Sequence, residues 1–300
     1  MSGRFALLLT VNCKLSTFFR MKTLAIVGTG LIGASFGLAV RKAGFAGPIL
    51  GVSSPGALAD AARVGAIDRG ASLVEAAAEA DLIFLAQPIG RILDTIRRLA
   101  PLVRPDALVT DAGSTKCLIA DLALQSITQG QFLGGHPMAG KEKRGAQAAE
   151  ADLFQGCTWV LTPEEPAGME TKQAADLVAW IRRIGGRPLV MDPEEHDRVV
   201  SFTSHLAQLA STGLASTVAE QLHPPERIAV AGPGLTDMTR LALSSYDLWR
   251  DILATNTDFI ERALGLYIQK LEHLRENLRT RQLQEEFRKA AELAGKLRRS

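Results

Sequence analysis

The sequence predicts an α/β fold, a doubly wound parallel sheet, followed by an all-α C-terminal domain. From Thr23 to Met191, short apolar runs alternate with segments that repeat their apolar residues at helical spacing. That alternation is typical of parallel strands joined by crossover helices. After Asp192 no convincing strand follows, and only the helical spacing continues. A glycine-rich turn directly after the first apolar run indicates a sheet of the Rossmann type.

The expected elements alternate along the first two thirds of the chain. The apolar runs expected to form strands are Thr23–Gly28, Pro48–Val52, Asp81–Ala86, Ala107–Asp111, Phe132–Gly134, Thr158–Leu161 and Arg187–Met191. The segments expected to form helices are Gly30–Lys42, Ala57–Val64, Leu73–Ala78, Ile89–Leu99, Thr115–Gln125, with Ser114 as its N-cap, and Lys172–Ile184. Beyond Asp192 the expected helices are His196–Val218, Asp237–Leu243 and Ser245–Leu271, the last continuing towards the C-terminus.

The change of pattern near Asp192 divides the chain. We expect a Rossmann domain over residues 21–191 and an all-helical domain over residues 192–300. Residues 1–20 are expected to be an N-terminal extension, because translation from Met21 would open directly into the first strand. The apolar run inside this extension, Phe5 to Val11, is too short to span a bilayer.

Composition narrows the classes of function. The 300 residues are 47% hydrophobic and 22% charged, which is ordinary globular composition. A formal net charge of +2 does not favour a nucleic acid as partner, and no segment favours a membrane. The three cysteines, Cys13, Cys117 and Cys157, include no CxxC pair, so we expect no disulfide framework and a reducing, cytoplasmic location. No group of Cys and His has the spacing of metal ligands, so no metal is expected.

The glycine-rich turn gives the first functional prediction. Gly28, Gly30 and Gly33 form a GxGxxG motif between the first strand and the first helix, with Leu31 and Ile32 inside it. The first glycine permits the tight turn, the second lets the backbone approach a pyrophosphate, and the third lets the helix pack on the strand. The helix N-terminus then holds the anion. We therefore expect a dinucleotide cofactor at these five residues.

The end of the second strand bears on the choice between NAD and NADP. An acidic residue there would bind the ribose hydroxyls of NAD, but this chain has Ser53 and Ser54. Either serine could hydrogen-bond a 2′-phosphate, with Arg63 as the nearest arginine, so NADP is slightly favoured and NAD stays open. Gln87 and Pro88 follow the third strand, where they either border the cofactor or form an ordinary turn.

Two further segments lie at strand ends, where open α/β sheets bind their ligands. Ser114 follows the fourth strand in DAGSTK, and His136 follows the fifth in GGHPMAG. A hydroxyl and an imidazole on adjacent strand ends can both face a nicotinamide. A histidine framed by two glycines and a proline at such an end is more often functional than structural.

These motifs resemble those of the prephenate/arogenate dehydrogenase family of tyrosine biosynthesis. The residues that carry the resemblance are GTGLIG at 28–33, DAGSTK at 111–116, GGHPMAG at 134–140, SHLAQ at 204–208 and TDMTRLA at 236–242. They keep the family's order and spacing from about Met21 to about Leu271. The resemblance implies a Rossmann domain followed by a helical substrate and dimerisation domain, and hence a homodimer formed through the helical domain.

The resemblance also implies an oxidative decarboxylation. In this family a hydride leaves the ring carbinol carbon of prephenate for NAD(P), the ring carboxylate departs as carbon dioxide, and 4-hydroxyphenylpyruvate forms. His136 matches the family's catalytic histidine, which accepts the proton of the ring hydroxyl; an unperturbed imidazole, with a pKa of ~6.5, is available as a base at neutral pH. Ser114 matches the serine that hydrogen-bonds this histidine and the substrate hydroxyl and sets the tautomer.

Four residues of the helical domain match family positions near the substrate. Arg240 matches the arginine that holds a substrate carboxylate, for which a guanidinium fork is suited. His196 and His205 match two further positions, although His205 could instead be a buried structural residue. Gln208 stands where many members have the second histidine of SHLPH. Its neutral amide cannot supply a cation to a pyruvyl group but could accept from the ammonium of arogenate.

Several functions stay open on the sequence. Beside prephenate dehydrogenase stand an NADP-dependent arogenate dehydrogenase, which would make tyrosine directly, and a dual cyclohexadienyl dehydrogenase. Another Rossmann oxidoreductase, of the β-hydroxyacid or imine reductase type, would have a catalytic lysine after a glycine-rich segment, and none closely follows Gly234. A non-catalytic NADP sensor would not need Ser114, His136 and Arg240 together.

Overall fold

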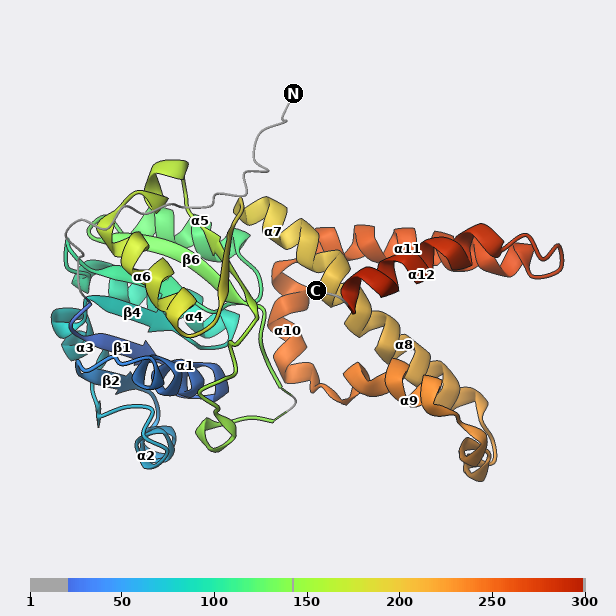
Figure 1. Ribbon diagram of the computed structural model, residues 1–300, viewed down its shortest axis with the longest axis horizontal. Helices are drawn as coiled ribbons and strands as arrows, with labels where there is room; N and C mark the ends of the chain where they lie inside the picture. The colour runs from blue at the N-terminus through green and yellow to red at the C-terminus, as the bar shows by residue number, and fades with distance from the viewer. Residues whose placement is uncertain (1–20, 142, 299–300) are drawn as a thin grey trace.

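The computed structural model describes residues 21–141 and 143–298, so the expectations for residues 1–20, Cys13 included, lie outside the described residues. Figure 1 shows two parts. A twisted sheet with helices against both faces forms one part, and a series of helices that ends in two projecting arms forms the other. The α/β class with a helical C-terminal region is therefore confirmed.

The sheet has eight strands in the order β3-β2-β1-β4-β5-β6-β7-β8. Their bounds are β1 Leu24–Val27, β2 Ile49–Val52, β3 Arg69–Gly70, β4 Leu82–Leu85, β5 Leu108–Asp111, β6 Gln131–Pro137, β7 Thr158–Thr162 and β8 Arg187–Val190. The chain adds strands outward from β1 first to one side and then, from β4, to the other. This reversal beside β1 creates the crevice in which open α/β sheets bind ligands.

Helices cover the sheet on both faces. Their bounds are α1 Leu31–Lys42, α2 Pro55–Arg63, α3 Leu73–Glu79, α4 Ile89–Leu99, α5 Cys117–Ser126 and α6 Lys172–Arg183. Along β1 the side chains alternate, because successive residues of a strand point to opposite faces. Leu24 and Ile26 join the core under α1 and α6, while Ala25 and Val27 join the core under α3, α4 and α5. Burial on both faces explains why β1 is apolar throughout.

The order of elements was predicted correctly, with three differences in the sheet region. The two-residue strand β3 was missed, because two exposed residues carry no apolar signal. Strand β7 runs antiparallel to β6, a local departure from the doubly wound parallel sheet that was predicted. Among the described residues of the link from β6 to β7, the only helical segment is a short 3₁₀ turn, Ala146–Ala148, and no crossover helix returns the chain to the same end of the sheet. The predicted cap of α5 by Ser114 is also wrong, as the site below explains.

The helical part begins directly after the sheet. Its bounds are α7 Pro193–Val200, a π-helical turn Ser201–His205, α8 Leu206–Gln221, α9 Pro233–Thr239, a 3₁₀ turn Arg240–Leu243, α10 Tyr246–Thr255, α11 Thr257–Asn277 and α12 Gln284–Leu297. Two predicted helices are therefore interrupted. The π-turn lies inside the expected helix His196–Val218, and Asn256 divides the expected helix Ser245–Leu271. Neither Ser201–His205 nor Asn256 includes a glycine or a proline, so no helix-breaking residue marks either interruption in the sequence.

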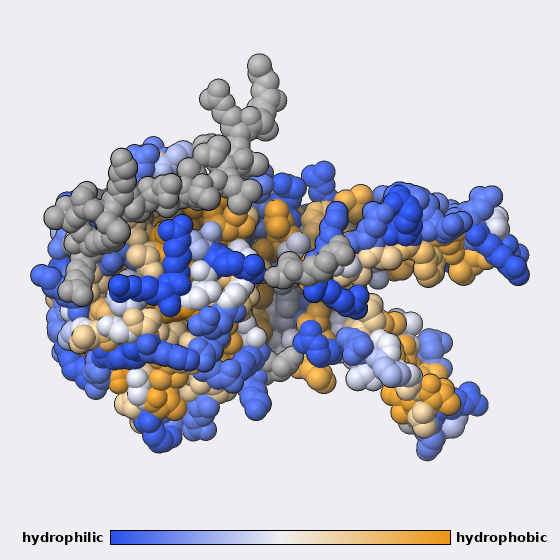
Figure 2. Space-filling model, viewed as in Figure 1, coloured by the Kyte–Doolittle hydropathy of each residue, from blue (hydrophilic) through white to orange (hydrophobic). Residues whose placement is uncertain are grey.

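The two arms expose apolar side chains. In Figure 1, α8 and α9 form one arm and α11 and α12 form the other. Figure 2 shows apolar surface on the side of the α11–α12 arm that faces the α8–α9 arm. Exposed apolar residues of the two arms include Met238 on α9, Leu271 on α11 and Phe287 on α12. In the described part of the chain, no helix combines the length and the apolar content needed to cross a membrane.

The glycines at the start of α1 give a matched pair of stability tests. A Cβ built on Gly33 would lie 2.0 Å from the carbonyl oxygen of Gly28 and 2.8 Å from Ile26, whereas a Cβ on Gly30 would meet nothing within 4 Å. Gly33→Ala should therefore lower the free energy of unfolding by about 1–3 kcal/mol through overpacking. Thermal unfolding should show a loss of several degrees in Tm.

Gly30→Ala is the control for this pair. It adds the same methyl group at the same turn but into open space, so its Tm should match that of the wild type. An unchanged Tm for Gly33→Ala would contradict the close packing of α1 on β1.

Candidate active site

The glycine turn forms a cradle at the carboxyl end of β1. Gly28 has φ +95°, a conformation that favours glycine, and a Cβ there would lie 2.4 Å from the carbonyl oxygen of Ala86. Gly30 begins α1 without a side-chain cap and has open space where a Cβ would project. A helix N-terminus with uncapped backbone N–H groups and open space is what a pyrophosphate requires. These residues therefore fit a dinucleotide.

The remaining residues expected at the cofactor lie along the same edge of the sheet. Ser53 and Ser54 follow β2 and are exposed. The side-chain oxygen Oε1 of Gln87 accepts a hydrogen bond of 2.8 Å from Thr95, and Pro88 precedes the first turn of α4. The backbone N–H of Gly90 in that turn donates to Asp251 of α10 over 3.0 Å. The helical part thus contacts the nucleotide edge directly.

His136 lies within β6, one residue before the strand ends. The preceding residue, Gly135, is held on both sides by a buried ion pair: its N–H donates to Asp111 over 3.0 Å and its carbonyl accepts from Nζ of Lys116 over 2.8 Å. Lys116 and Asp111 also contact each other, and both are fully buried. This pair fixes the backbone that carries His136, as a buried and well-paired salt bridge can.

A series of hydrogen bonds runs from His136 into the helical part. Nδ1 of His136 lies 2.8 Å from Nε2 of His196, and Nδ1 of His196 lies 2.7 Å from Oδ1 of Asp197. His136 is 9% exposed, while His196 and Asp197 are buried. We call this series the histidine relay. It joins β6 to α7 and orders three titratable groups in one line.

The relay fixes which nitrogen of each ring carries the proton. A carboxylate only accepts, so Nδ1 of His196 donates to Asp197 and its Nε2 holds a lone pair. That lone pair accepts from Nδ1 of His136, so Nε2 of His136 is the nitrogen with the free lone pair. Within the described residues this Nε2 has no hydrogen-bond partner. The relay therefore leaves Nε2 of His136 as a hydrogen-bond acceptor and a base.

Burial keeps both rings of the relay neutral. Desolvation lowers the pKa of His136 well below its ordinary value, and His196, Lys116 and His205 lower it further. Desolvation also lowers the pKa of His196, against the opposing effect of Asp197. The pKa of Asp197 is lowered because its hydrogen bonds to His196 and Cys117 outweigh its burial. The site thus combines an ionised carboxylate with neutral imidazoles at neutral pH.

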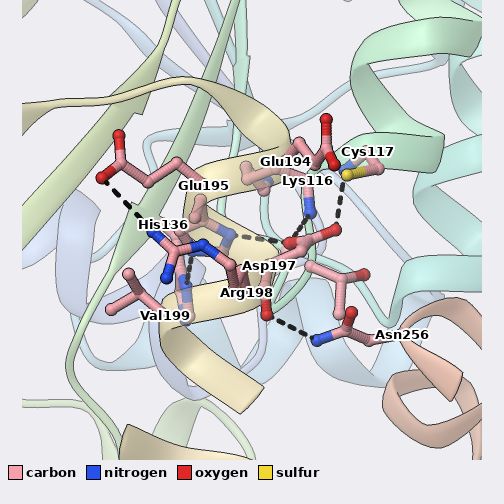
Figure 3. Close-up of polar contacts among 12 residues, drawn as sticks. Lys116, Cys117, His136, Glu194, Glu195, Asp197, Arg198, Val199 and Asn256 are labelled. Atoms are coloured by element: carbon pink, nitrogen blue, oxygen red, sulfur yellow. Dashed lines mark hydrogen bonds and ion pairs between the residues drawn. The ribbon is translucent and has the colours of Figure 1, made fainter. Parts of the chain in front are cut away.

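Asp197 also caps helix α5. Its Oδ1 accepts from the backbone N–H of Lys116 over 2.7 Å, and its Oδ2 accepts from that of Cys117 over 2.9 Å. Figure 3 shows the carboxylate of Asp197 directed at this helix end. Ser114 makes no side-chain cap, and in the described chain it has no hydrogen bond to His136, whose Nδ1 is taken by His196. The contact expected from Ser114 is thus made by His196.

The other expected substrate residues surround the relay from the helical part. His205, in the π-turn, is buried, and its ring meets that of Trp249 edge to face at 5.8 Å. Gln208 of α8 donates from Nε2 to the carbonyl oxygen of Leu241 over 2.9 Å, which ties it to the turn that carries Arg240. Arg240 itself is exposed. His136, His196 and His205 are close enough to interact electrostatically, whereas Arg240 does not belong to this buried group.

Sequence reasoning missed three groups of this site. Asp197 follows His196 directly, and the pair His-Asp at the start of a helix was the available signal. Lys116 was visible as the end of DAGSTK, but its burial against Asp111 was not. Asn256, which is 4% exposed between α10 and α11, gave no signal in the sequence. Among the described residues, no three His, Cys, Asp or Glu side chains gather as a metal site would require.

Two family models match the chain. The model described as prephenate dehydrogenase, nucleotide-binding domain, matches residues 36–190. The model described as prephenate dehydrogenase, dimerization domain, matches residues 192–292. Together they cover the chain from within α1 to within α12, in the order observed here, while β1 and the glycine turn precede the first matched residue.

Curated proteins of similar sequence carry related names. The chain is 36% identical over 261 residues to prephenate dehydrogenase of Bacillus subtilis, covering 84% of this chain and 69% of that one. It is 34% identical over 267 residues to prephenate dehydrogenase of Lactococcus lactis, covering 86% and 70%. It is 31% identical over 264 residues to cyclohexadienyl dehydrogenase of Zymomonas mobilis, covering 85% and 87%.

Solved structures agree in fold over nearly the whole chain. Prephenate dehydrogenase of Aquifex aeolicus, in complex with hydroxyphenyl propionate and NAD+, superimposes with a TM-score of 0.84 at 30% identity, covering 94% of this chain and 99% of that one. Arogenate dehydrogenase of Synechocystis superimposes with a TM-score of 0.77 at 29% identity, covering 92% and 99%.

The buried histidines predict a loss of stability in mild acid. The pKa values of His136, His196 and His205 are all lowered in the folded chain, that of His205 to about 4. Below the unfolded value of about 6.5, the unfolded chain therefore binds more protons than the folded one. Stability should be full above that pH and fall as the pH drops from 6.5 to 5, by up to about 1.4 kcal/mol per pH unit for each histidine. Urea unfolding at successive pH values measures this slope.

Two variants test whether the buried histidines cause this dependence of stability on pH. His205→Asn should flatten the slope between pH 6.5 and 5, because one proton-binding difference is removed. His273→Gln replaces an exposed histidine and serves as the matched control. Equal slopes for His205→Asn and the wild type would contradict the buried neutral state of His205.

Proposed function

This chain belongs to the prephenate dehydrogenase family, and from that premise we propose that His136 is the base in an oxidative decarboxylation of prephenate to 4-hydroxyphenylpyruvate. The chain is a dehydrogenase that uses NAD or NADP. The observation that carries the assignment of the base is the histidine relay, which leaves Nε2 of His136 as an acceptor without a partner among the described residues. The reaction belongs to tyrosine biosynthesis.

His136 accepts the proton of the ring hydroxyl at Nε2. The hydrogen bond from its Nδ1–H to Nε2 of His196 is kept. The positive charge that develops on the His136 ring is stabilised by the carboxylate of Asp197, which acts through His196. When bound, the nicotinamide supplies the acceptor for the hydride that leaves the carbinol carbon. The bond to the ring carboxylate then breaks, its electron pair completes the aromatic ring, and carbon dioxide departs. The proton on His136 is available to return to the phenolate oxygen.

The substrate is an anion and needs an anchor that does not oppose decarboxylation. Arg240 is proposed to bind a substrate carboxylate, as its position in TDMTR suggests. His196 and His205 are proposed to surround the ring, and Ser114 to contact its hydroxyl from the end of β5. Because His136, His196 and His205 are neutral, the departing carboxylate meets no buried cation among these imidazoles. Only interactions that strengthen in the transition state raise the rate.

The cofactor is proposed to lie along the carboxyl edge of β1, β2 and β4. Gly28, Gly30, Leu31, Ile32 and Gly33 would hold the pyrophosphate at the start of α1. Ser53 and Ser54 would face the adenosine ribose, and Gln87 and Pro88 would border the nicotinamide half. Because no acidic residue follows β2 directly, we propose that NADP is accepted at least as well as NAD.

One observation favours arogenate as an alternative substrate. The side-chain nitrogen Nε2 of Gln208 donates to the carbonyl oxygen of Leu241 over 2.9 Å and to the hydroxyl of Thr212 over 3.2 Å. A carbonyl only accepts, so the amide orientation is fixed and Oε1 is left as an acceptor. An acceptor suits the ammonium of arogenate better than the keto group of prephenate. A dual cyclohexadienyl dehydrogenase is the intermediate case.

The domain organisation and assembly form part of the same proposal. We propose a Rossmann domain over residues 21–191 and a helical substrate and dimerisation domain over residues 192–300. The matched dimerization-domain model and the exposed apolar side chains of the two arms support a homodimer through the helical domain. The partners are then one small substrate and a second copy, without nucleic acid or membrane, and the proposed location is the cytoplasm.

The proposed function is tested by turnover of both substrates with both cofactors. Prephenate with NADP or NAD should give reduced cofactor, carbon dioxide and 4-hydroxyphenylpyruvate in equal amounts. Turnover of arogenate should reveal how far Oε1 of Gln208 broadens the substrate range. Reduced cofactor from neither substrate would contradict the proposal.

His136→Asn tests the assignment of the base in the same assay. It removes the acceptor at Nε2 and should lower kcat by about 10²–10⁴. The glycine cradle is distant from this change, so the Kd for the cofactor should stay at the wild-type value. Turnover within a few-fold of the wild type would show that another group accepts the proton.

A further inference from the structure

Asn256 is a buried polar residue at the break between α10 and α11. It is 4% exposed and belongs to neither helix, with φ −135° and ψ 27°. Its side-chain nitrogen Nδ2 lies 2.9 Å from the carbonyl oxygen of Asp197 and 3.1 Å from Nδ1 of His205. Figure 3 shows the Asn256 amide reaching the backbone of Asp197. One amide therefore joins the helix break to α7 and to the π-turn.

The carbonyl of Asp197 fixes the orientation of this amide. A carbonyl oxygen only accepts, so the NH₂ group of Asn256 must face it; the reversed amide would place two oxygens 2.9 Å apart. The second N–H of the same nitrogen then points at Nδ1 of His205. Nδ1 must accept, so the proton of the neutral His205 ring is on Nε2.

The surroundings of His205 keep its ring neutral. Desolvation lowers its pKa to about 4, His196 lowers it too, and Asp197 opposes the shift. The ring packs edge to face against Trp249 of α10, and His136 of β6 interacts with it electrostatically. A π-helical turn carries His205, and such turns occur frequently at functional sites.

We propose that Asn256 is a positioning residue that holds His205 as a neutral Nε2–H donor to an acceptor oxygen of the substrate. The proposal rests on the proposed function for the identity of that oxygen. His205 then has the tautomer opposite to that of His136, whose Nε2 accepts. The site then offers one acceptor and one donor on two uncharged rings. Asp197 determines both tautomers. Its carboxylate acts on His136 through His196, and its backbone carbonyl acts on His205 through Asn256.

The tautomer can be measured without any turnover. The chain contains five histidines, and ring ¹⁵N labelling resolves Nδ1–H from Nε2–H in each. We expect Nε2–H for His205 in the wild-type protein, assigned by loss of its signals in His205→Asn. A wild-type His205 with the proton on Nδ1 overturns the proposal whether or not the protein turns over prephenate.

Asn256→Asp replaces the NH₂ group, which donates, by an oxygen, which accepts, with almost no change in the size of the side chain. At a pH where the ring is neutral, the carboxylate accepts from His205, so the proton should move to Nδ1 and Nε2 should lose its donor. Because a hydrogen bond to a charged group is worth about 1.5–3 kcal/mol, KM for prephenate should rise about ten-fold or more. Retention of Nε2–H in Asn256→Asp, or an unchanged KM, overturns the proposal.

The surface of the chain offers a matched control. Nδ2 of Asn277 lies 3.4 Å from Nδ1 of His273, an exposed pair of the same kind on α11. Asn277→Asp should leave KM and the signals of His205 unchanged. If Asn256→Asp does not fold, the tautomer of His205 in the wild-type protein tests the proposal by itself. Absence of dehydrogenase activity in the wild type together with the expected tautomer would contradict the proposed function and leave the role of Asn256 on His205 standing.

Discussion

The site depends on the buried Asp197 and the directions in which its oxygens accept hydrogen bonds. Its carboxylate accepts from His196, from the backbone of Lys116 and from the backbone of Cys117, and its carbonyl accepts from Asn256. A buried carboxylate is tolerated only when such partners replace water. Because these oxygens only accept, they impose a direction on every neighbour. The start of α5, the relay and the break between α10 and α11 are thus ordered by one residue.

This order explains how a buried base can be available. Burial lowers the pKa of His136, which weakens it as a base but keeps it unprotonated at neutral pH. Asp197 compensates, because in a site of low dielectric its charge stabilises an imidazolium two hydrogen bonds away. The ion pair of Lys116 and Asp111 holds the neighbouring backbone of Gly135 on both sides. The ring is therefore fixed before substrate arrives, and little reorganisation is needed when charge develops.

Much of the fold could be predicted from the sequence, because it follows from local patterns. The apolar run of β1 and the glycines at 28, 30 and 33 identify the strand, the turn and the helix, and α4 has the bounds expected from its apolar spacing. The site was predicted less completely. The partner of His136 depends on where α7 crosses β6, which no local pattern reports. The breaks at the π-turn and at Asn256 were missed because neither carries a glycine or a proline to mark the end of a helix.

The account is tested most directly by a crystal structure of this chain with NAD+ and hydroxyphenyl propionate, the pair present in the Aquifex aeolicus structure. The ring hydroxyl should lie within about 2.6–3.2 Å of Nε2 of His136. Nδ1 of the same ring should remain hydrogen-bonded to Nε2 of His196. A hydroxyl bound by another side chain, or a His136 ring turned so that Nε2 faces His196, would contradict the account.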